Sequence, residues 1–174
     1  MKRIAFACAV LLAAATPAAR AADAPPTDAQ IAHIVVTANQ VDVDAGNLAR
    51  EHAQSKDVQS FAVRMVTDHG GVNKQASELA GKLHLTPEAN PTSASLKKGG
   101  DDNLAALKKL SGAAFDKAYV DHEVAYHEAV LGAVDKTLIP NAKNAELKAL
   151  LEQSRPVFES HLEHAKQLQA VLGK

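Results

Sequence analysis

The chain has 174 residues, a formal net charge of −1, only 3% aromatic residues and no basic run, so a nucleic-acid-binding protein is disfavoured. Its one cysteine, Cys8, lies in an N-terminal apolar segment. This position excludes disulfides, thiolate catalysis and cysteine-bound zinc from the chain that follows.

The N-terminus has the order of a secretory signal peptide. A charged start at Lys2 and Arg3 is followed by an apolar run over residues 4–15 and by small residues up to Ala21. The apolar run is shorter than the about 20 residues that a membrane-spanning helix needs. We therefore predict a signal peptide over residues 1–21 and a secreted, periplasmic protein.

The mature chain is long enough for one hydrophobic core. Cleavage lowers the basic count from 19 to 16 against 20 acidic residues, a net charge of −4, and no later segment is apolar enough to span a bilayer. We expect residues 22–26 to be flexible and residues 27–174 to form a single domain. An acidic surface with few aromatic residues identifies neither a protein partner nor an oligomeric state.

Two helical patterns come first in the mature chain. Thr27, with Gln30 three residues later, makes a capping box, and apolar residues then recur at helical spacing up to Ala53. Ser55 is a typical N-cap for a second helix that ends near Leu83. Because the link between them is short, these helices should be antiparallel neighbours.

The middle of the chain is predicted to be a long crossover. Residues 86–100 contain two prolines and two glycines, and a short helix is expected over residues 102–110. Ser111 then caps a third long helix that ends before Pro140.

A fourth long helix is expected over residues 142–172. No strand-like alternation occurs, so the sequence predicts an all-α antiparallel four-helix bundle whose crossover carries a short extra helix.

Weak helix formers interrupt two of these patterns. Pro156 lies inside the fourth helix, where its missing N–H should kink the axis. Gly70 and Gly71 in the second helix indicate a bend or a close helix approach, or are simply tolerated in a well-packed bundle.

Every long helix carries ligand-type residues on its apolar face. In chain order they are Asp42, His69, Asp116, Glu123, His127 and His161. At about 1.5 Å per residue from each turn, Asp42 should be level with His69, and Glu123 level with His161. These heights are compatible with one shared site.

Buried carboxylates are paired, protonated or metal-bound, and imidazoles that converge with carboxylates from facing helices build metal sites in bundles. We predict ligation by His69, His127, His161, Glu123 and Asp42. In the alternative, Asp42, Asp116, Tyr119 and Tyr126 bond the histidines into the metal-free polar core of a structural or interaction protein.

The spacing of these residues limits the metal chemistry. No histidine is preceded by glutamate three residues earlier, so a carboxylate-bridged di-iron enzyme is disfavoured. A histidine-rich site with one or two carboxylates fits a single zinc, copper(II) or iron ion. An oxidase or peroxidase also needs an open coordination position and a substrate pocket, and the sequence indicates neither. Metal binding without catalysis is therefore favoured.

Three stretches resemble the signature sequences of a known family: FAVRMVTDH at 61–69, LSGAAFDKAYVDHEVAYHEAV at 110–130 and RPVFESHLEHA at 155–165. The family is the domain of unknown function 4142 family, secreted bacterial proteins often labelled membrane or outer-membrane proteins. The resemblance covers nearly the whole mature chain. It implies a ferritin-like four-helix bundle, export and no assigned reaction.

The resemblance also carries over individual residues. The family's usual polar positions match Asp68, His69, Asp116, Tyr119, His127, Pro156 and His161, and its first-helix glutamate is replaced by the shorter Asp42. We expect Asp116, Tyr119 and Asp68 to orient the imidazoles. Pro156 is expected to have a structural role. The resulting hypothesis is a periplasmic metal-binding bundle that acts in envelope homeostasis or stress.

Overall fold

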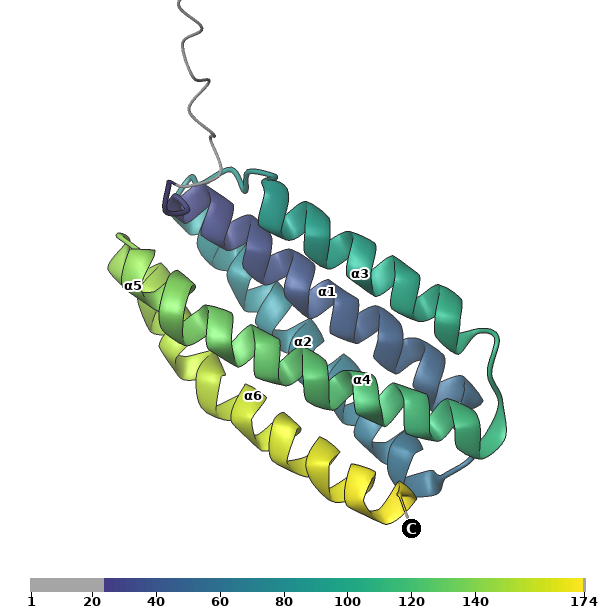
Figure 1. The fold of residues 1–174 in the computed structure, drawn as a ribbon. Coiled ribbons are helices and arrows are strands. Elements are labelled where there is room, and N and C mark those ends of the chain that lie inside the picture. The colour runs from purple at the N-terminus through teal and green to yellow at the C-terminus, as the bar shows by residue number, and fades with distance from the viewer. Residues whose placement is uncertain (1–23, 174) are drawn as a thin grey trace, which may run out of the picture.

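Five long helices form the described part of the chain, residues 24–173 of a computed structural model (Figure 1). The predicted signal peptide over residues 1–21 lies outside the described residues. The long helices are α1 (Asp28–His52), α2 (Lys56–Lys82), α3 (Pro91–Leu107), α4 (Gly112–Ala133) and α6 (Ala145–Leu172). A π-helical segment, η1 (Val134–Leu138), and the short α5 (Ile139–Asn141) follow α4. No strand occurs among the described residues, so the all-α prediction is confirmed.

The helices pack as two antiparallel pairs with one covering helix. α1 packs against α2, α4 packs against α6, and α3 lies along α1 (Figure 1). Because α3 carries the chain back along the length of the bundle, α2 and α4 run in the same direction. This is the predicted ferritin-like bundle with a long crossover.

The predicted boundaries within the crossover are wrong. Residues 86–100 were expected to form a loop and residues 102–110 a short helix, but α3 begins at Pro91. The Asn90 side chain accepts a hydrogen bond from the Ser93 N–H and closes a capping box, and Pro91 suits the first helical turn. Gly100 remains helical because it packs closely against α1: an added Cβ would lie 2.8 Å from Val41 Cγ2.

The end of α4 also departs from the prediction. The α-helix gives way to η1 after Ala133, and Pro140 lies inside the short α5 instead of ending the helix. Proline has no N–H and its ring crowds the carbonyl four residues earlier, and a wider π turn relieves that conflict. The turn that follows is held by Asp28, whose carboxylate accepts hydrogen bonds from the N–H groups of Lys143 and Asn144.

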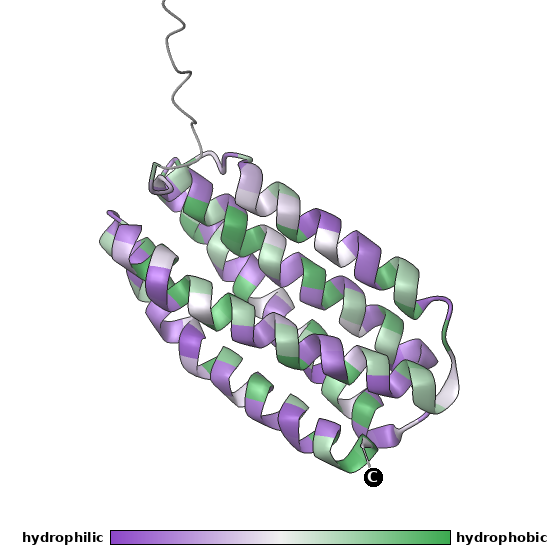
Figure 2. Cartoon of the chain, viewed as in Figure 1, coloured by the Kyte–Doolittle hydropathy of each residue, from purple (hydrophilic) through white to green (hydrophobic). Residues whose placement is uncertain are grey.

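A polar layer divides the core into two apolar clusters. One cluster gathers around Phe61, Phe115 and Tyr119, and the other around Ile31, Leu150 and other aliphatic residues. Figure 2 shows hydrophilic and hydrophobic positions alternating along every helix, as expected of amphipathic helices. The layer between the clusters contains the ligand-type residues that the helical pattern placed inward.

The glycines give a first test of the packing. Gly71→Ala should raise the free energy of unfolding by up to about 1 kcal/mol, because the added methyl meets no atom within 4 Å and alanine is the better helix former. Gly100→Ala should lower it by about 1–3 kcal/mol because Val41 occupies the space. Thermal and urea unfolding measure both changes. Equal effects at the two positions would contradict the α1–α3 packing.

Gly70 and Gly71 do not mark a close approach of two helices, one of the three interpretations of this pair. A Cβ added at either glycine would meet no atom within 4 Å.

Candidate metal centre

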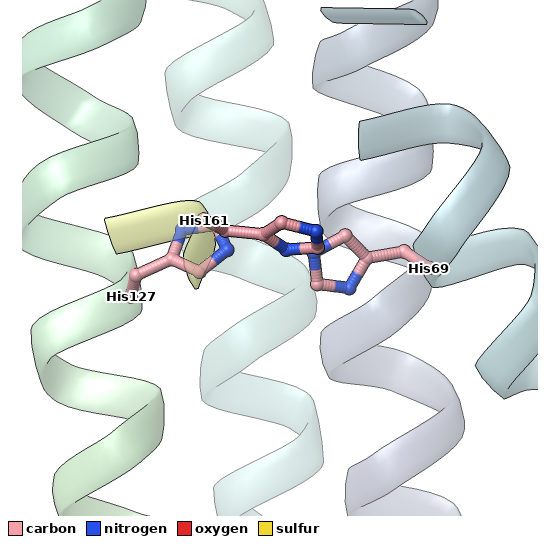
Figure 3. Close-up of side chains that lie close together, drawn as sticks. All are labelled: His69, His127 and His161. Carbon is pink, nitrogen blue, oxygen red and sulfur yellow. The ribbon is translucent and has the colours of Figure 1, made fainter. Parts of the chain in front are cut away.

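Three buried histidines meet in the polar layer (Figure 3). His69 comes from α2, His127 from α4 and His161 from α6, and each is at most 2% exposed. The ring centres of His69 and His161 are 5.0 Å apart, and each of these rings is 5.5 Å from that of His127. One nitrogen of each ring lies within 4.8 Å of one nitrogen of each of the others. The helical pattern therefore predicted three residues that the fold brings together.

Each imidazole is held by one of its two nitrogens. His69 Nδ1 is 2.8 Å from Asn39 Oδ1, His127 Nδ1 is 2.9 Å from the Glu123 carbonyl oxygen, and His161 Nε2 is 2.8 Å from Asp68 Oδ2. The two carbonyl oxygens and the Asp68 carboxylate all accept hydrogen bonds. In the neutral imidazoles the held nitrogen therefore carries the proton.

The remaining nitrogen of each ring carries a lone pair that no described residue occupies. His69 Nε2, His127 Nε2 and His161 Nδ1 are buried without a hydrogen bond to any of the residues that the structure describes. Buried polar atoms are nearly always bonded, so three unpartnered acceptors in one layer need an explanation. An imidazole fixed by its other nitrogen in this way is typical of a metal ligand.

Two carboxyl groups adjoin the histidines. Asp42 Oδ2 lies 3.5 Å from His69 Nδ1, and Glu123 Oε2 lies 3.5 Å from His127 Nδ1. Within the described chain, Asp42 Oδ1 and both Glu123 side-chain oxygens have no hydrogen-bond partner. One ligand atom each from Asp42, Glu123 and His127 lies within 4.8 Å of the others. His127 thus belongs to both groups and links the carboxylates to the histidines.

Burial keeps the whole cluster close to neutral. It raises the pKa of Glu123 to about 8 and the pKa of Asp42 well above its usual value, with the neighbouring Glu123 charge as a second cause for Asp42. Burial lowers the pKa of His127 to about 4 and also lowers the pKa values of His69 and His161. A bound cation would reverse this preference and favour the ionised carboxylates.

Asp116 does not orient an imidazole, contrary to the expectation. Its carboxylate accepts hydrogen bonds from the backbone N–H groups of Gln54 and Ser55, at 2.9 and 2.7 Å. Asp116 lies in the first turns of α4, at the end of the bundle where α1 turns into α2, so it is about two helical turns from Glu123. Its structural role is to fix the α1–α2 link.

Asp116→Ala should therefore affect stability without affecting metal binding. Loss of two charge-assisted hydrogen bonds from a buried carboxylate is expected to lower the free energy of unfolding by about 2–3 kcal/mol. Urea unfolding measures that loss, and copper and zinc titrations of the folded variant should match the wild type. Weaker metal binding by the folded variant would instead support the predicted role of Asp116 in orienting an imidazole.

The Tyr119 hydroxyl bonds to no imidazole among the described residues, and it lies close to the carboxyl groups of Glu123 and Asp42. This hydroxyl is buried with no hydrogen-bond partner in residues 24–173. Burial raises the pKa of Tyr119, and the neighbouring charges of Glu123 and Asp42 raise it further. The Tyr126 hydroxyl donates to the Ala38 carbonyl oxygen at 3.1 Å, so Tyr126 does not hold a histidine either. Pro156 lies inside α6, five residues before His161, and its kink stays a prediction.

Asp68 accepts a hydrogen bond from His161 Nε2, as expected of a residue that orients an imidazole, and it connects the cluster to the surface. The Asp68 side chain is 33% exposed and also accepts a hydrogen bond from Arg64 Nε at 3.3 Å.

Asp68→Ala should weaken metal binding about 10–100-fold, because His161 loses the group that orients its ring. Asp101→Ala, which removes an exposed aspartate paired with Lys97, is the matched control. Equal metal affinities of the two variants would contradict an orienting role.

Asn39 is a site residue that the helical pattern did not predict. This side chain is 3% exposed, holds His69 through Oδ1, and donates from Nδ2 to the Val35 carbonyl oxygen at 2.8 Å. The available signal was its position three residues before Asp42, on the same face of α1. Asparagine is common on polar helix surfaces, so this spacing alone did not separate it from a solvent-facing residue.

The fold and the cluster together define a class of protein, an all-α bundle with a buried histidine and carboxylate centre. The chain belongs to the domain of unknown function family DUF4142, whose sequence profile matches residues 13–168. A search among curated proteins finds no match. Among the described residues, no helix has the length and apolar character needed to cross a membrane.

Two solved structures share the fold. One is a DUF305 protein from Streptomyces coelicolor, described as secreted, with 15% identity, a TM-score of 0.69, and coverage of 84% of this chain and 93% of that chain. The other is CopM in its Cu(II)-bound form, with 13% identity, a TM-score of 0.65, and coverage of 84% of this chain and 98% of that chain. At these identities the likeness concerns the fold.

Proposed function

We propose that the protein binds one transition-metal ion in the periplasm, through His69, His127 and His161, and acts in metal homeostasis or stress of the cell envelope. The observation that carries the proposal is the set of three buried imidazole nitrogens, each with a free lone pair, in one layer of the bundle. Asp42 and Glu123 would supply negative charge to balance the cation.

The spacing of the nitrogens supports this proposal. Two imidazole nitrogens on one tetrahedral ion, each about 2.0–2.1 Å from the metal, lie about 3.4 Å apart. One ring nitrogen of each of the three histidines lies within 4.8 Å of one from each of the others. Side-chain rotations that move each nitrogen by about 1 Å would bring them to ligand spacing.

The donor set favours particular ions. Imidazole suits zinc, copper and iron, and the general order of affinities for divalent ions places Cu(II) above Zn(II) and Fe(II). We therefore expect Cu(II) to bind most tightly. That CopM has this fold and a Cu(II)-bound form is consistent with copper, and the secreted DUF305 neighbour is consistent with a location outside the cytoplasm.

The test is a metal titration of the mature, untagged protein, together with elemental analysis of protein purified from the periplasm. Wild-type protein should bind close to one Cu(II) or Zn(II) per chain, and the triple variant His69→Ala, His127→Ala and His161→Ala should bind none at this site. The matched control replaces three peripheral histidines, His33, His52 and His84, with alanine and should keep wild-type stoichiometry. Circular dichroism checks that each variant is helical.

The alternative function, a structural or interaction protein with a metal-free polar core, predicts a different result. It has some support, because one nitrogen of each histidine is already hydrogen-bonded. Under this alternative, neither the wild type nor a helical triple variant binds copper, zinc or iron at micromolar concentration. Such a result would overturn the metal proposal.

A further inference from the structure

A cavity of about 400 Å³ runs from one end of the bundle to the polar layer. Its lining includes Gln30 near the start of α1 and Asp42 in the middle of the same helix. At about 1.5 Å per residue these positions are about 18 Å apart, so the cavity is long and narrow. Its volume falls in the range of small-molecule sites, about 300–1,000 Å³. The sequence indicated no such pocket.

The walls of the cavity are mostly apolar. They include Ile34, Val72, Leu150, Leu151 and Phe158. All five of these side chains are at most 8% exposed, so they form a fixed surface in the core. An elongated apolar body would fill this space and remove that surface from water.

The inner end of the cavity is polar and unsatisfied. Asp42 and His69 line it, and Asp42 Oδ1 and His69 Nε2 are buried without a hydrogen-bond partner in the part of the chain that the structure describes. A hydroxyl group has one O–H donor, so it can donate a hydrogen bond to the His69 Nε2 lone pair that no described residue occupies. The residues that line the cavity include no lysine or arginine, so a carboxylate head would be buried there without a cationic partner.

The π-helical segment provides a separate indication. Val134, Thr137 and Leu138 of η1 line the cavity, and π-helical turns within α-helices occur frequently at functional sites. The irregular end of α4 therefore shapes the wall of the same space that reaches the polar layer.

We infer that this cavity binds an elongated apolar molecule with one hydroxyl head, and that the head lies against Asp42 and His69. This site goes beyond the proposed function, because its apolar walls do not depend on a metal ion. Its polar end uses the His69 Nε2 lone pair that the proposed metal ion would occupy, so the two ligands are tested one at a time. Ligand binding and metal binding can therefore fail separately.

The experiment is isothermal titration calorimetry on the mature protein after treatment with chelator, with 1-decanol as the probe and decanoate as its carboxylate counterpart. We expect 1-decanol to bind with a stoichiometry of one and a negative heat-capacity change, the mark of apolar burial. Decanoate should bind about ten-fold more weakly or less. Equal or tighter binding of decanoate would overturn the hydroxyl assignment, and no binding of either probe would overturn the site.

A cavity-filling variant locates the binding. Ala133 lines the cavity at the end of α4, away from the histidines, so Ala133→Phe should weaken 1-decanol binding about ten-fold or more and leave the Cu(II) stoichiometry unchanged. Ala170→Phe, at an exposed position of α6, is the matched control and should bind like the wild type. Undiminished 1-decanol binding by a folded Ala133→Phe variant would show that the probe binds elsewhere. Metal binding without 1-decanol binding would leave the proposed function intact.

Discussion

His127→Leu is expected to lower the affinity for Cu(II) at least about 100-fold, equivalent to about 3 kcal/mol, and to leave the metal-free protein as stable as the wild type or more stable. Metal affinity falls because His127 lies in both the histidine group and the carboxylate group. Calorimetric or competition titration measures the affinity, and urea unfolding in chelator measures the stability.

Stability is retained for a specific reason. His127 Nε2 is buried and unpartnered, and leucine of similar volume removes that unsatisfied atom at a gain of about 1 kcal/mol. His127→Leu removes the ring N–H that donates to the Glu123 carbonyl oxygen. That carbonyl lies inside α4 and still accepts a hydrogen bond from a backbone N–H of the helix. His164→Leu, outside the cluster, is the control. A large loss of stability together with unchanged metal binding would identify His127 as a structural residue of a polar core.

Glu123→Gln should reduce the pH dependence of stability in metal-free protein. The pKa of Glu123 is about 8 in the folded protein, against 4.5 for an ordinary glutamate. Between these values the folded protein holds a proton that the unfolded chain releases, so the free energy of unfolding falls as pH rises. From pH 7.5 to 9 the part of this loss that comes from Glu123 is about 1 kcal/mol.

The choice of pH window depends on the groups that face Glu123. Below about pH 7.5 the histidines with lowered pKa values, His69, His122, His127, His161 and His164, act in the opposite direction, because they are still partly protonated in the unfolded chain. Above about pH 7.5 these histidines are neutral in both states, and Tyr119 remains protonated. The carboxyl groups of Glu123 and Asp42 then dominate the pH dependence.

Urea unfolding at several pH values, in chelator, measures this prediction. Glu123→Gln should flatten the decline between pH 7.5 and 9 without abolishing it, since burial still raises the pKa of Asp42. Glu163→Gln, at an exposed position of α6, should keep the wild-type slope. A steeper decline in Glu123→Gln than in the wild type would contradict a buried, protonated Glu123.

Helical periodicity was sufficient to find most of the centre. Asp42, His69, Glu123, His127 and His161 lie on apolar faces of long helices. Counting residues from the turns placed Asp42 level with His69 and Glu123 level with His161, with His127 one turn away. These are local properties of a regular helix in a bundle with short links. For that reason the sequence alone predicted the fold class, the inward residues and their heights.

Tertiary structure decided what each inward residue contacts. Asp116 and Glu123 share one face of α4, yet one holds the α1–α2 link and the other lies beside His127. Asn39 acquires its role only because α2 places His69 against it. The long α3 likewise depends on the fit of Gly100 against Val41. Periodicity fixes which face of a helix is buried, but contacts between helices depend on how side chains distant in sequence fit together in three dimensions.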